Sequence, residues 1–352
     1  MKEKKYFKII VLLITSFLIL IAGSVLLIDP YFHYHKPLKF LSYRFGNQRY
    51  INDGVARYFK YDSIITGTSM IANFKASLFD NLFNCNSIKI PFFGGSYKEI
   101  NDNLERTLKR KKNIKYVLRG LDYEAIIEDS DKMNYDNLPK YLYDNNILND
   151  YKYLFNKEVV FKGLSGVIIY TLLGKNTTSF DEYSNWNNQY KAGKENVIKI
   201  YKRNKKENIK EEKLEKKDIE MIDKNIEKNV ISLIKKYPNT KFIYFITPYS
   251  IVYWDQLKQE GKIEKQIMAE KYMIEKLLEY PNVELYSFVS NYGMICNLDN
   301  YMDYAHYMGN ISDKILYWIS KKEYQLTKEN YEEYIRKNLE FYKNYNYDSI
   351  FE

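Results

Sequence analysis

Short apolar runs alternate with stretches of helical periodicity along most of the chain. Runs rich in β-branched and aromatic residues predict five strands, at residues 61–66, 87–92, 114–118, 241–247 and 283–288. Between these runs, apolar side chains recur at helical spacing from Tyr97 to Leu108, from Ile219 to Leu233 and from Met268 to Leu278. Strands that alternate with helices form parallel sheets, and right-handed crossovers place helices on both faces. We therefore predict an α/β fold with a central five-stranded parallel sheet, whose ligand site lies at the carboxyl ends of the strands.

The longest apolar run lies near the N-terminus. Residues 9–28 carry no charge, and at about 1.5 Å per residue a helix of this length spans the roughly 30 Å hydrocarbon core of a bilayer. The preceding residues 1–8 are rich in lysine, so the positive-inside rule predicts a cytoplasmic tail and an extracytoplasmic location for everything after residue 28. A cleaved signal peptide is the alternative, but its apolar region is usually about 7–15 residues and ends in a small-x-small site, which is missing here. We expect a retained, single-pass anchor in the cell membrane.

The exported part of the chain divides by pattern. We assign a juxtamembrane stalk to 29–60, a catalytic domain to 61–325 with an insertion or lid at about 123–210, and a C-terminal helix to 326–352. The insertion is rich in Tyr, Asn, Asp and Lys and breaks the alternation of strands and helices. Its Trp186 and Tyr190 could stack on sugar rings, but a loosely helical cap explains these aromatic residues as well.

The composition of the chain mainly excludes classes of partner and cofactor. The chain has 54 basic and 45 acidic residues, a net charge of +9, but the lysine-rich stretches alternate with glutamate, which is typical of a solvated helix face. No element interleaves arginine with aromatic residues as base-reading surfaces do, so the sequence argues against a nucleic-acid partner. Two cysteines and three histidines are too few for a zinc cluster, and we expect no metal or cofactor. Cys85 and Cys296 could form one disulfide or remain two thiols, and the sequence leaves both open.

Two segments that follow predicted strands carry residues suited to nucleophilic catalysis. A Gly-Thr-Ser turn at 67–69 follows the first strand, and Asp-Tyr-Ala-His at 303–306 follows the fifth. A serine at a strand-to-helix turn lies where backbone N–H groups stabilise developing negative charge. His306 is the candidate base by elimination, because the other histidines lie close to the membrane. Asp303 can hold one imidazole nitrogen while the other faces Ser69. Each segment alone is more often an ordinary turn or cap, but their joint placement at one sheet edge favours a triad.

These segments resemble the first and last blocks of the SGNH, or GDSL, hydrolase superfamily. The first block carries the nucleophile, here matched by Ser69, and the last carries an Asp-x-x-His pair, here Asp303 and His306. The resemblance covers roughly residues 60–325. It implies a flavodoxin-like three-layer sandwich and chemistry through an acyl-serine intermediate.

The oxyanion hole is where the chain departs from that family. Gly94 and Gly95 lie where the second block supplies a glycine N–H. The third block of the family, Gly-x-Asn-Asp, would donate an asparagine side chain, but Asp122 stands in its place. An ionised carboxylate cannot donate this hydrogen bond and would repel the oxyanion. Either backbone N–H groups of Ser69 and Gly95 form the hole, with help from Asn73, or the activity is specialised.

The membrane anchor and the altered third block are together similar to an envelope subgroup that includes the teichoic acid D-alanylation protein and the alginate acetylation proteins. This similarity implies ester chemistry on a cell-envelope polysaccharide or teichoic acid, beside a multi-spanning membrane acyltransferase. Acyl transfer to the polymer and hydrolysis by water share one acyl-serine intermediate, so the sequence leaves both open. A catalytically silent binding or scaffold protein remains an alternative. Asp122 favours it, whereas retention of all three triad residue types disfavours it.

Overall fold

The chain folds into two compact units. The computed structural model describes residues 2–111, 113–144, 146–206 and 209–352. Unit 1 combines the chain up to Lys60 with Asn137–Tyr183, and unit 2 combines Tyr61–Asp136 with Ser184–Glu352. The expected insertion is therefore shared between the units, because its middle part belongs to unit 1 and its two ends belong to unit 2.

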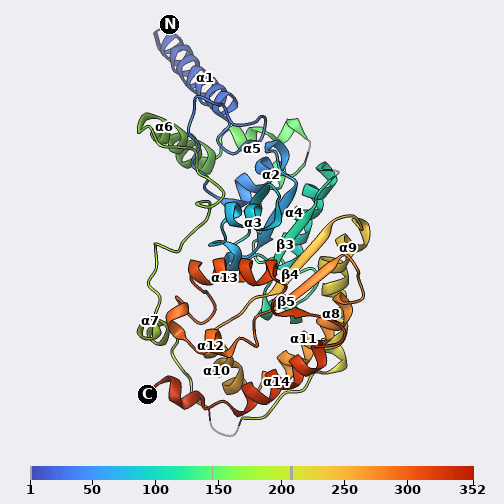
Figure 1. Cartoon of the computed structure of the whole chain (residues 1–352). Coiled ribbons are helices and arrows are strands. Elements are labelled where there is room, and N and C mark those ends of the chain that lie inside the picture. Colours follow the sequence, from blue (N-terminus) through green and yellow to red (C-terminus); the bar gives the residue numbers. More distant parts are fainter. Residues whose placement is uncertain (1, 112, 145, 207–208) are drawn as a thin grey trace. The chain divides into compact units, whose positions relative to one another are not determined.

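Unit 2 contains a mostly parallel sheet of six strands in the order β2-β1-β3-β4-β5-β6 (Figure 1). The strands are β1 (Ser63–Gly67), β2 (Ser87–Pro91), β3 (Tyr116–Leu121), β4 (Lys241–Ile246), β5 (Val283–Ser287) and β6 (Gln325–Leu326). β1 to β5 are parallel, and β6 pairs antiparallel with β5. A strand lies at each of the five predicted positions and these five are parallel, but the sheet has a sixth strand that the sequence did not predict. β6 has only two residues and leaves no periodic pattern in the sequence.

Burial explains why the apolar runs form strands. Every residue of β1 and of β2 is buried, and β4 exposes only its first residue, Lys241. Strands covered on both faces have nearly continuous apolar runs. β3 continues three residues beyond its predicted end because the buried Arg119 donates hydrogen bonds to Asn229 O at 2.8 Å and to Tyr97 O at 3.3 Å. These bonds compensate for burying a charged side chain in the sheet.

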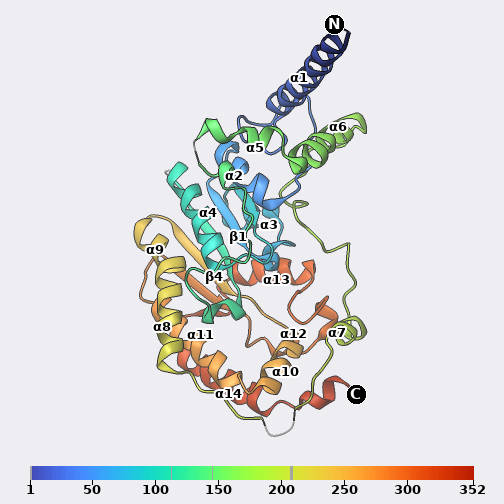
Figure 2. The same cartoon turned by 180° about the vertical axis from the view of Figure 1, so that it is seen from behind.

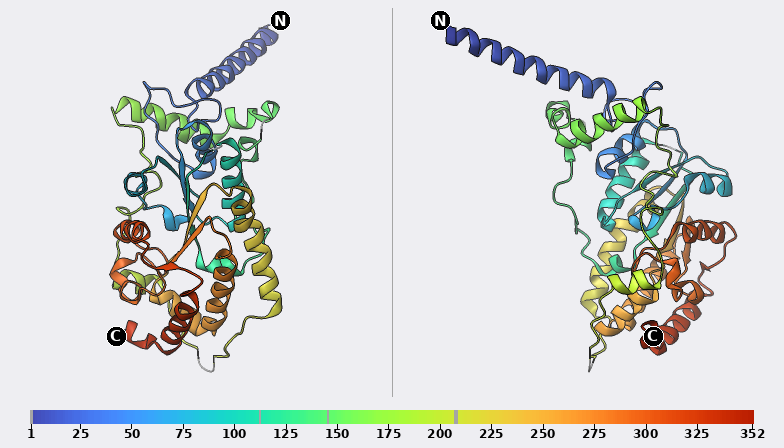
Figure 3. Two further views of the ribbon diagram at one scale, coloured as in Figure 1. Left: turned by 45° about the vertical axis from the view of Figure 1, so that its right-hand side comes forward. Right: turned by 90° about the vertical axis from the view of Figure 1, so that its left-hand side faces the viewer.

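Helices cover both faces of this sheet (Figures 1, 2 and 3). One face carries α3 (Ala76–Phe83) and α13 (Gly309–Ser320), and the other carries α4 (Tyr97–Arg110), α8 (Lys216–Ile226) and α11 (Ile263–Leu277). The chain first adds β2 on one side of β1 and then adds β3 on the other side. Because the crossovers are right-handed, this change of side also changes the face of the sheet on which the connecting helices lie. α14 (Tyr331–Asn344) packs along α11 where the C-terminal helix was expected.

Shorter helices complete unit 2. They are η1 (Ser69–Ile71), η2 (Tyr123–Ile127), α7 (Lys194–Ile200), η6 (Glu227–Ile231), α9 (Ser232–Lys236), α10 (Ile251–Glu260), α12 (Tyr292–Ile295), η7 (Leu298–Asn300) and η8 (Tyr347–Ile350). η6 is a π-helical segment that joins α8 to α9.

Unit 1 begins with the apolar N-terminal helix α1. Its helices are α1 (Lys2–Ile28), α2 (Gln48–Tyr58), η3 (Lys140–Leu142), η4 (Ile147–Asn149), α5 (Tyr151–Leu154), the π-helix η5 (Glu158–Leu164) and α6 (Ser165–Leu172). Among the described residues, α1 supplies the single helix that is long and apolar enough to cross a membrane. η5 runs directly into α6, so that together they form one continuous helix.

Asp29 fixes the chain where it leaves α1. Its buried carboxylate accepts hydrogen bonds from the N–H groups of His33, Tyr34 and His35 at 2.7 to 2.9 Å. It also accepts one from the hydroxyl of Tyr153 in α5, at 2.8 Å. The region expected to be a stalk is therefore folded together with residues 137–183.

The direction in which successive strands are added to the sheet reverses after β2, so the point of reversal lies between β1 and β3. These strands are neighbours, although β2 and its helices come between them in the sequence. In doubly wound sheets of this order, ligands bind at the carboxyl ends of the strands on either side of the reversal. Ser69 follows β1 and Asp122 follows β3, so both lie at this edge of the sheet.

Candidate active site

Ser69 lies in the turn that follows β1. Gly67 ends the strand with φ of +149°, and a Cβ at this position would come within 3.0 Å of Ile71 Cγ2, so the turn requires glycine. Thr68 caps the short helix η1 because its Oγ1 accepts from the N–H of Met70 at 3.3 Å. Within the described residues, no hydrogen bond is found for the N–H of Ser69 itself. The turn thus presents a hydroxyl and a free backbone donor at the same edge of the sheet.

A tight turn holds Asp303 and His306 in a fixed relation. Its flanking residues Tyr301 and Tyr307 form an antiparallel bridge, and the N–H of Met302 donates to His306 O at 2.9 Å. Asp303 Oδ1 accepts from the N–H of His306 at 2.8 Å. Because the carboxylate is bonded to the backbone of its own turn, it has little freedom to leave the imidazole.

Two buried tyrosines anchor this turn to its neighbours. The hydroxyl of Tyr307 donates to Met70 O at 2.7 Å, and the hydroxyl of Tyr301 donates to Pro248 O at 3.1 Å. Met70 is the residue after Ser69, so the first bond ties the histidine turn directly to the serine turn.

The structure brings together all three residues of the predicted triad. Ser69 Oγ lies 2.7 Å from His306 Nε2, and His306 Nδ1 lies 2.8 Å from Asp303 Oδ2. A carboxylate acceptor at Nδ1 assigns the proton to that nitrogen and leaves a lone pair on Nε2 for the serine hydroxyl. Burial alone would raise the pKa of Asp303, but its hydrogen bonds to His306 and to backbone N–H groups, with the charge interaction, lower that pKa below its ordinary value. Asp303 is therefore ionised at neutral pH, as an orienting carboxylate must be.

Asp122 is buried beside this trio and has one unsatisfied oxygen. Its Oδ1 accepts from Thr68 Oγ1 and from the hydroxyl of Tyr249, both at 3.0 Å, whereas its Oδ2 is buried with no hydrogen-bond partner. Burial raises the pKa of Asp122 to about 6, against the opposing effects of these two hydrogen bonds and of the charges on His306 and Arg119. Below about pH 6 the side chain is a neutral acid, and Oδ2 can then donate a hydrogen bond. The objection that an ionised Asp122 would repel an oxyanion therefore holds only above that pH.

Asn73 has a buried amide donor without a partner. Its Oδ1 accepts from the N–H of Trp186 at 3.1 Å, while Nδ2 is buried and makes no hydrogen bond. Leaving such a donor unsatisfied costs about 1–3 kcal/mol, so it marks a place where a ligand acceptor would be favourable. Asn73 lies on the short stretch of chain that follows Ser69 and is held there by the insertion.

The two aromatic residues suggested for sugar stacking differ in their environment. Trp186 is buried, and its indole lies edge-on to the imidazole of His306, with ring centroids 5.7 Å apart at 86°. Tyr190 is exposed and lies 6.0 Å from Trp186 between ring centroids. Trp186 therefore packs against His306, and of these two residues only Tyr190 presents an exposed ring on which a sugar could stack.

The glycine pair after β2 is placed differently from the expectation. The N–H of Gly95 donates to Phe92 O at 2.8 Å, so it is engaged within its own turn rather than free for an oxyanion. Gly94 is exposed with φ of +61°, and its carbonyl accepts from Asn134 Nδ2 at 2.8 Å. The free donors close to the serine in the sequence are its own N–H and the amide of Asn73.

Tyr249 is a site residue that the sequence analysis missed. It follows β4 at the same edge of the sheet, and its hydroxyl is one of the two donors to Asp122. Its position just after a buried strand could have identified it, because that edge is where ligand sites lie in this class of sheet.

Neither a metal site nor a disulfide is found in the described part of the chain. No group of three or more His, Cys, Asp or Glu side chains there could hold a metal ion. Cys85 and Cys296 are both free thiols, which is one of the two alternatives that the sequence left open.

No family model matches the chain, and no curated protein or solved structure matches it. The resemblance to SGNH hydrolases therefore rests on two short sequence blocks alone. The function has to be inferred from the geometry around Ser69, His306 and Asp303.

Proposed function

We propose that this chain is a membrane-anchored, extracytoplasmic serine esterase or O-acyltransferase of the SGNH type, with Ser69 as nucleophile and His306 as general base. The observation that carries the proposal is the unbroken hydrogen-bond chain from Asp303 through His306 to Ser69, with distances of 2.8 and 2.7 Å. A serine that merely capped a helix would accept a hydrogen bond from a backbone N–H instead of pairing with an imidazole. The position after β1, beside the reversal of strand order, supports the same assignment.

The geometry supports a two-step reaction. His306 Nε2 takes the proton of Ser69 Oγ as this oxygen attacks the ester carbonyl, and Asp303 stabilises the imidazolium that forms. The tetrahedral intermediate collapses, the alcohol leaves with the proton from Nε2, and an acyl-serine remains. Water or a polymer hydroxyl then attacks the acyl-serine, gives its proton to Nε2, and carries the acyl group away while Ser69 regains its proton.

Two donors support stabilisation of the oxyanion. The N–H of Ser69 and the unpaired Nδ2 of Asn73 belong to the same turn, and each is free of a protein acceptor in the described structure. A third donor arises when Asp122 is protonated, since its Oδ2 has no other partner. Together they would supply the hydrogen bonds that the usual asparagine of the third block provides.

The substrate class follows from location and resemblance. An apolar N-terminal helix with a lysine-rich flank supports an extracytoplasmic location of the domain. Ester chemistry there would act on O-acyl groups of a cell-envelope polysaccharide or teichoic acid, and the exposed Tyr190 offers a ring for a sugar. A multi-spanning membrane acyltransferase is the proposed partner, as the resemblance implies.

Labelling with a serine-reactive fluorophosphonate tests the proposal. We expect the full-length protein in detergent to be labelled, and we expect labelling to be lost in Ser69→Ala and strongly reduced in His306→Ala. Ser320→Ala, at the end of α13, is the matched control and should label like the wild type. Turnover of an acetyl ester with and without an oligosaccharide acceptor then separates transfer from hydrolysis. An unlabelled wild type that is folded by circular dichroism would contradict an activated serine.

A catalytically silent scaffold protein is the second candidate. Two observations favour it: the carboxylate of Asp122 next to the trio, and the engaged N–H of Gly95. Such a protein would bind a teichoic acid or polysaccharide without labelling by the fluorophosphonate. This candidate requires two results together: the fluorophosphonate does not label the protein, and the protein sediments with cell-wall polymer.

A further inference from the structure

The helix formed by η5 and α6 in unit 1 exposes a row of large apolar side chains. Phe161 is 75% exposed and Leu172 is 80% exposed, and the same helix and its end expose Ile168, Ile169 and Leu173. Scattered apolar residues on a surface are ordinary, but a contiguous patch marks a surface that binds something. Most of the exposed large apolar residues outside α1 belong to unit 1.

The opposite side of this helix packs against the chain that leaves α1. A Cβ at Gly163 would lie only 3.0 Å from Pro30 Cγ and 3.0 Å from Tyr31 Cε2, so the helix backbone directly contacts these residues. Pro30 is the second residue after the end of α1 at Ile28. Two residues span at most about 7 Å, and the headgroup layer of a bilayer is about 5–7 Å thick on each side. If α1 spans the hydrocarbon core, the helix therefore lies at the depth of the lipid headgroups.

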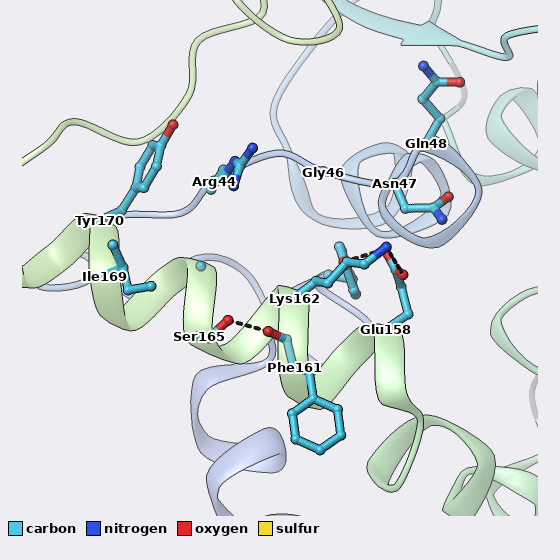
Figure 4. A pocket seen from close by; sticks show the side chains of 12 residues that line it. Arg44, Gly46, Asn47, Gln48, Glu158, Phe161, Lys162, Ser165, Ile169 and Tyr170 are labelled. Atoms are coloured by element: carbon cyan, nitrogen blue, oxygen red, sulfur yellow. Dashed lines mark hydrogen bonds and ion pairs between the residues drawn. The ribbon is translucent and has the colours of Figure 1, made fainter.

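A third side of the helix is open to water and mixes polar side chains with the apolar Phe161 and Ile169. A cavity of about 570 Å³ lies between it and the loop from Arg44 to Gln48 (Figure 4). Lys162 and Glu158 pair along the helix at one end of this cavity, at 2.9 Å, whereas the ring of Phe161 points away from the loop (Figure 4). Charge is confined to Glu158 and Lys162 near the start of the helix, and the exposed side chains of its second half are mostly apolar. An exposed apolar surface of this kind beside a membrane span favours contact with lipid.

We propose that the helix Glu158–Leu172 is a second membrane contact, which lies in the outer-leaflet interface beside α1 with Phe161, Ile168 and Leu172 directed into the acyl chains. The bilayer is the occupant that the position favours, because the helix packs directly against Pro30 and Tyr31, just beyond the end of the span at Ile28. A single spanning helix leaves the attached unit free to rotate about its exit point, and a second contact would fix the orientation of unit 1 on the membrane. This inference depends on α1 spanning the bilayer and is independent of the proposed chemistry.

Depth-dependent quenching of a single fluorophore tests this contact. The full-length chain with Cys85→Ala and Cys296→Ala carries Leu172→Cys, labelled with NBD, and is reconstituted in vesicles of phosphatidylglycerol and phosphatidylethanolamine. Tyr317→Cys on α13, an exposed aromatic position of unit 2, is the matched control. Vesicles are purified by flotation, so that only inserted protein is measured.

We expect nitroxide groups near the top of the acyl chains to quench the label at Leu172 about three-fold more than the control label, and aqueous iodide to quench it less. Ile168→Cys repeats the measurement at a second position of the row, in case one label perturbs the helix. If iodide reaches both positions as readily as the control, the lipid contact is excluded. Protection that appears only after a membrane partner protein is added would also overturn it, and would assign the row to that protein.

Discussion

Replacing Asp122 by asparagine should stabilise the protein at neutral pH and have much less effect in acid. Burial raises the pKa of Asp122 from 3.8 to about 6, so the folded state binds its proton more tightly than the unfolded state does. The neutral carboxyl therefore favours folding fully below about pH 4, and this stability is lost as the pH rises through about 6. Asparagine has a similar shape, can still accept from Thr68 and Tyr249, and cannot ionise.

A shift of about two pKa units corresponds to about 3 kcal/mol of stability. The carboxyl is already partly ionised in the unfolded state at pH 4.5, so part of this stability is lost at that pH. Between about pH 4.5 and pH 8, the free energy of unfolding of the wild type should therefore fall by about 2 kcal/mol more than that of Asp122→Asn. The comparison between two pH values matters because the new amide nitrogen takes the place of an oxygen without a partner and leaves its N–H groups unpaired. The cost of these unpaired groups does not depend on pH and therefore cancels. Glu270, whose pKa burial raises to about 7, adds a pH dependence that both proteins share and that also cancels.

Urea unfolding of the full-length protein in detergent, followed by tryptophan fluorescence at both pH values, measures this difference. Trp186, Trp254 and Trp318 all lie in unit 2, so the signal reports the unit that contains Asp122. Asp303→Asn serves as the control of opposite sign, because its lowered pKa stabilises the fold at neutral pH and that contribution is lost in acid. Wild type and Asp122→Asn with parallel pH dependence would refute the reasoning about the buried carboxyl.

Three further substitutions test the site. Asn73→Ala should lower kcat for an acetyl ester about 10²-fold by removing an oxyanion donor, while fluorophosphonate labelling of the folded protein slows but persists. Asp303→Asn should lower kcat by up to about 10⁴-fold, because an amide no longer selects the imidazole tautomer that Ser69 needs; a loss below ten-fold would contradict its orienting role. Tyr307→Phe leaves Met70 O without its donor and should cost about 1–3 kcal/mol in urea unfolding; an unchanged midpoint would count against this anchor.

The strands could be located from the sequence because they are covered on both faces. Their apolar runs are therefore nearly continuous and stand out from the polar stretches between them. The end of β3 was misplaced because Arg119 and Gly120 look like the start of a loop, whereas the guanidinium is in fact buried and donates from its two terminal nitrogens to backbone carbonyls. β6 was missed because its two residues form a strand only through pairing with β5.

The contact between Asp303 and His306 was predictable for a local reason, but the surroundings of this pair were not. Asp303 and His306 share one turn, so their spacing in the sequence already specifies their contact. The bond between Asn73 and the N–H of Trp186 joins distant parts of the chain, and no pattern near either residue predicts it. The turn that engages the N–H of Gly95 depends on backbone conformation, which a pair of glycines permits but does not specify.

Unit 1 is assembled from two pieces of chain, and this has a consequence for the order of folding. The carboxylate of Asp29 meets the hydroxyl of Tyr153 only after the chain has left unit 1 beyond Lys60 and returned at Asn137. With the proposed extracytoplasmic location, β1, β2 and β3 would all cross the membrane before the second piece arrives. Unit 1 would then be completed later than the first half of the sheet. A chain truncated before Asn137 would lack Tyr153, so the carboxylate of Asp29 would lose this hydrogen bond. The aromatic residues after Asp29 would then be exposed to chaperones and proteases.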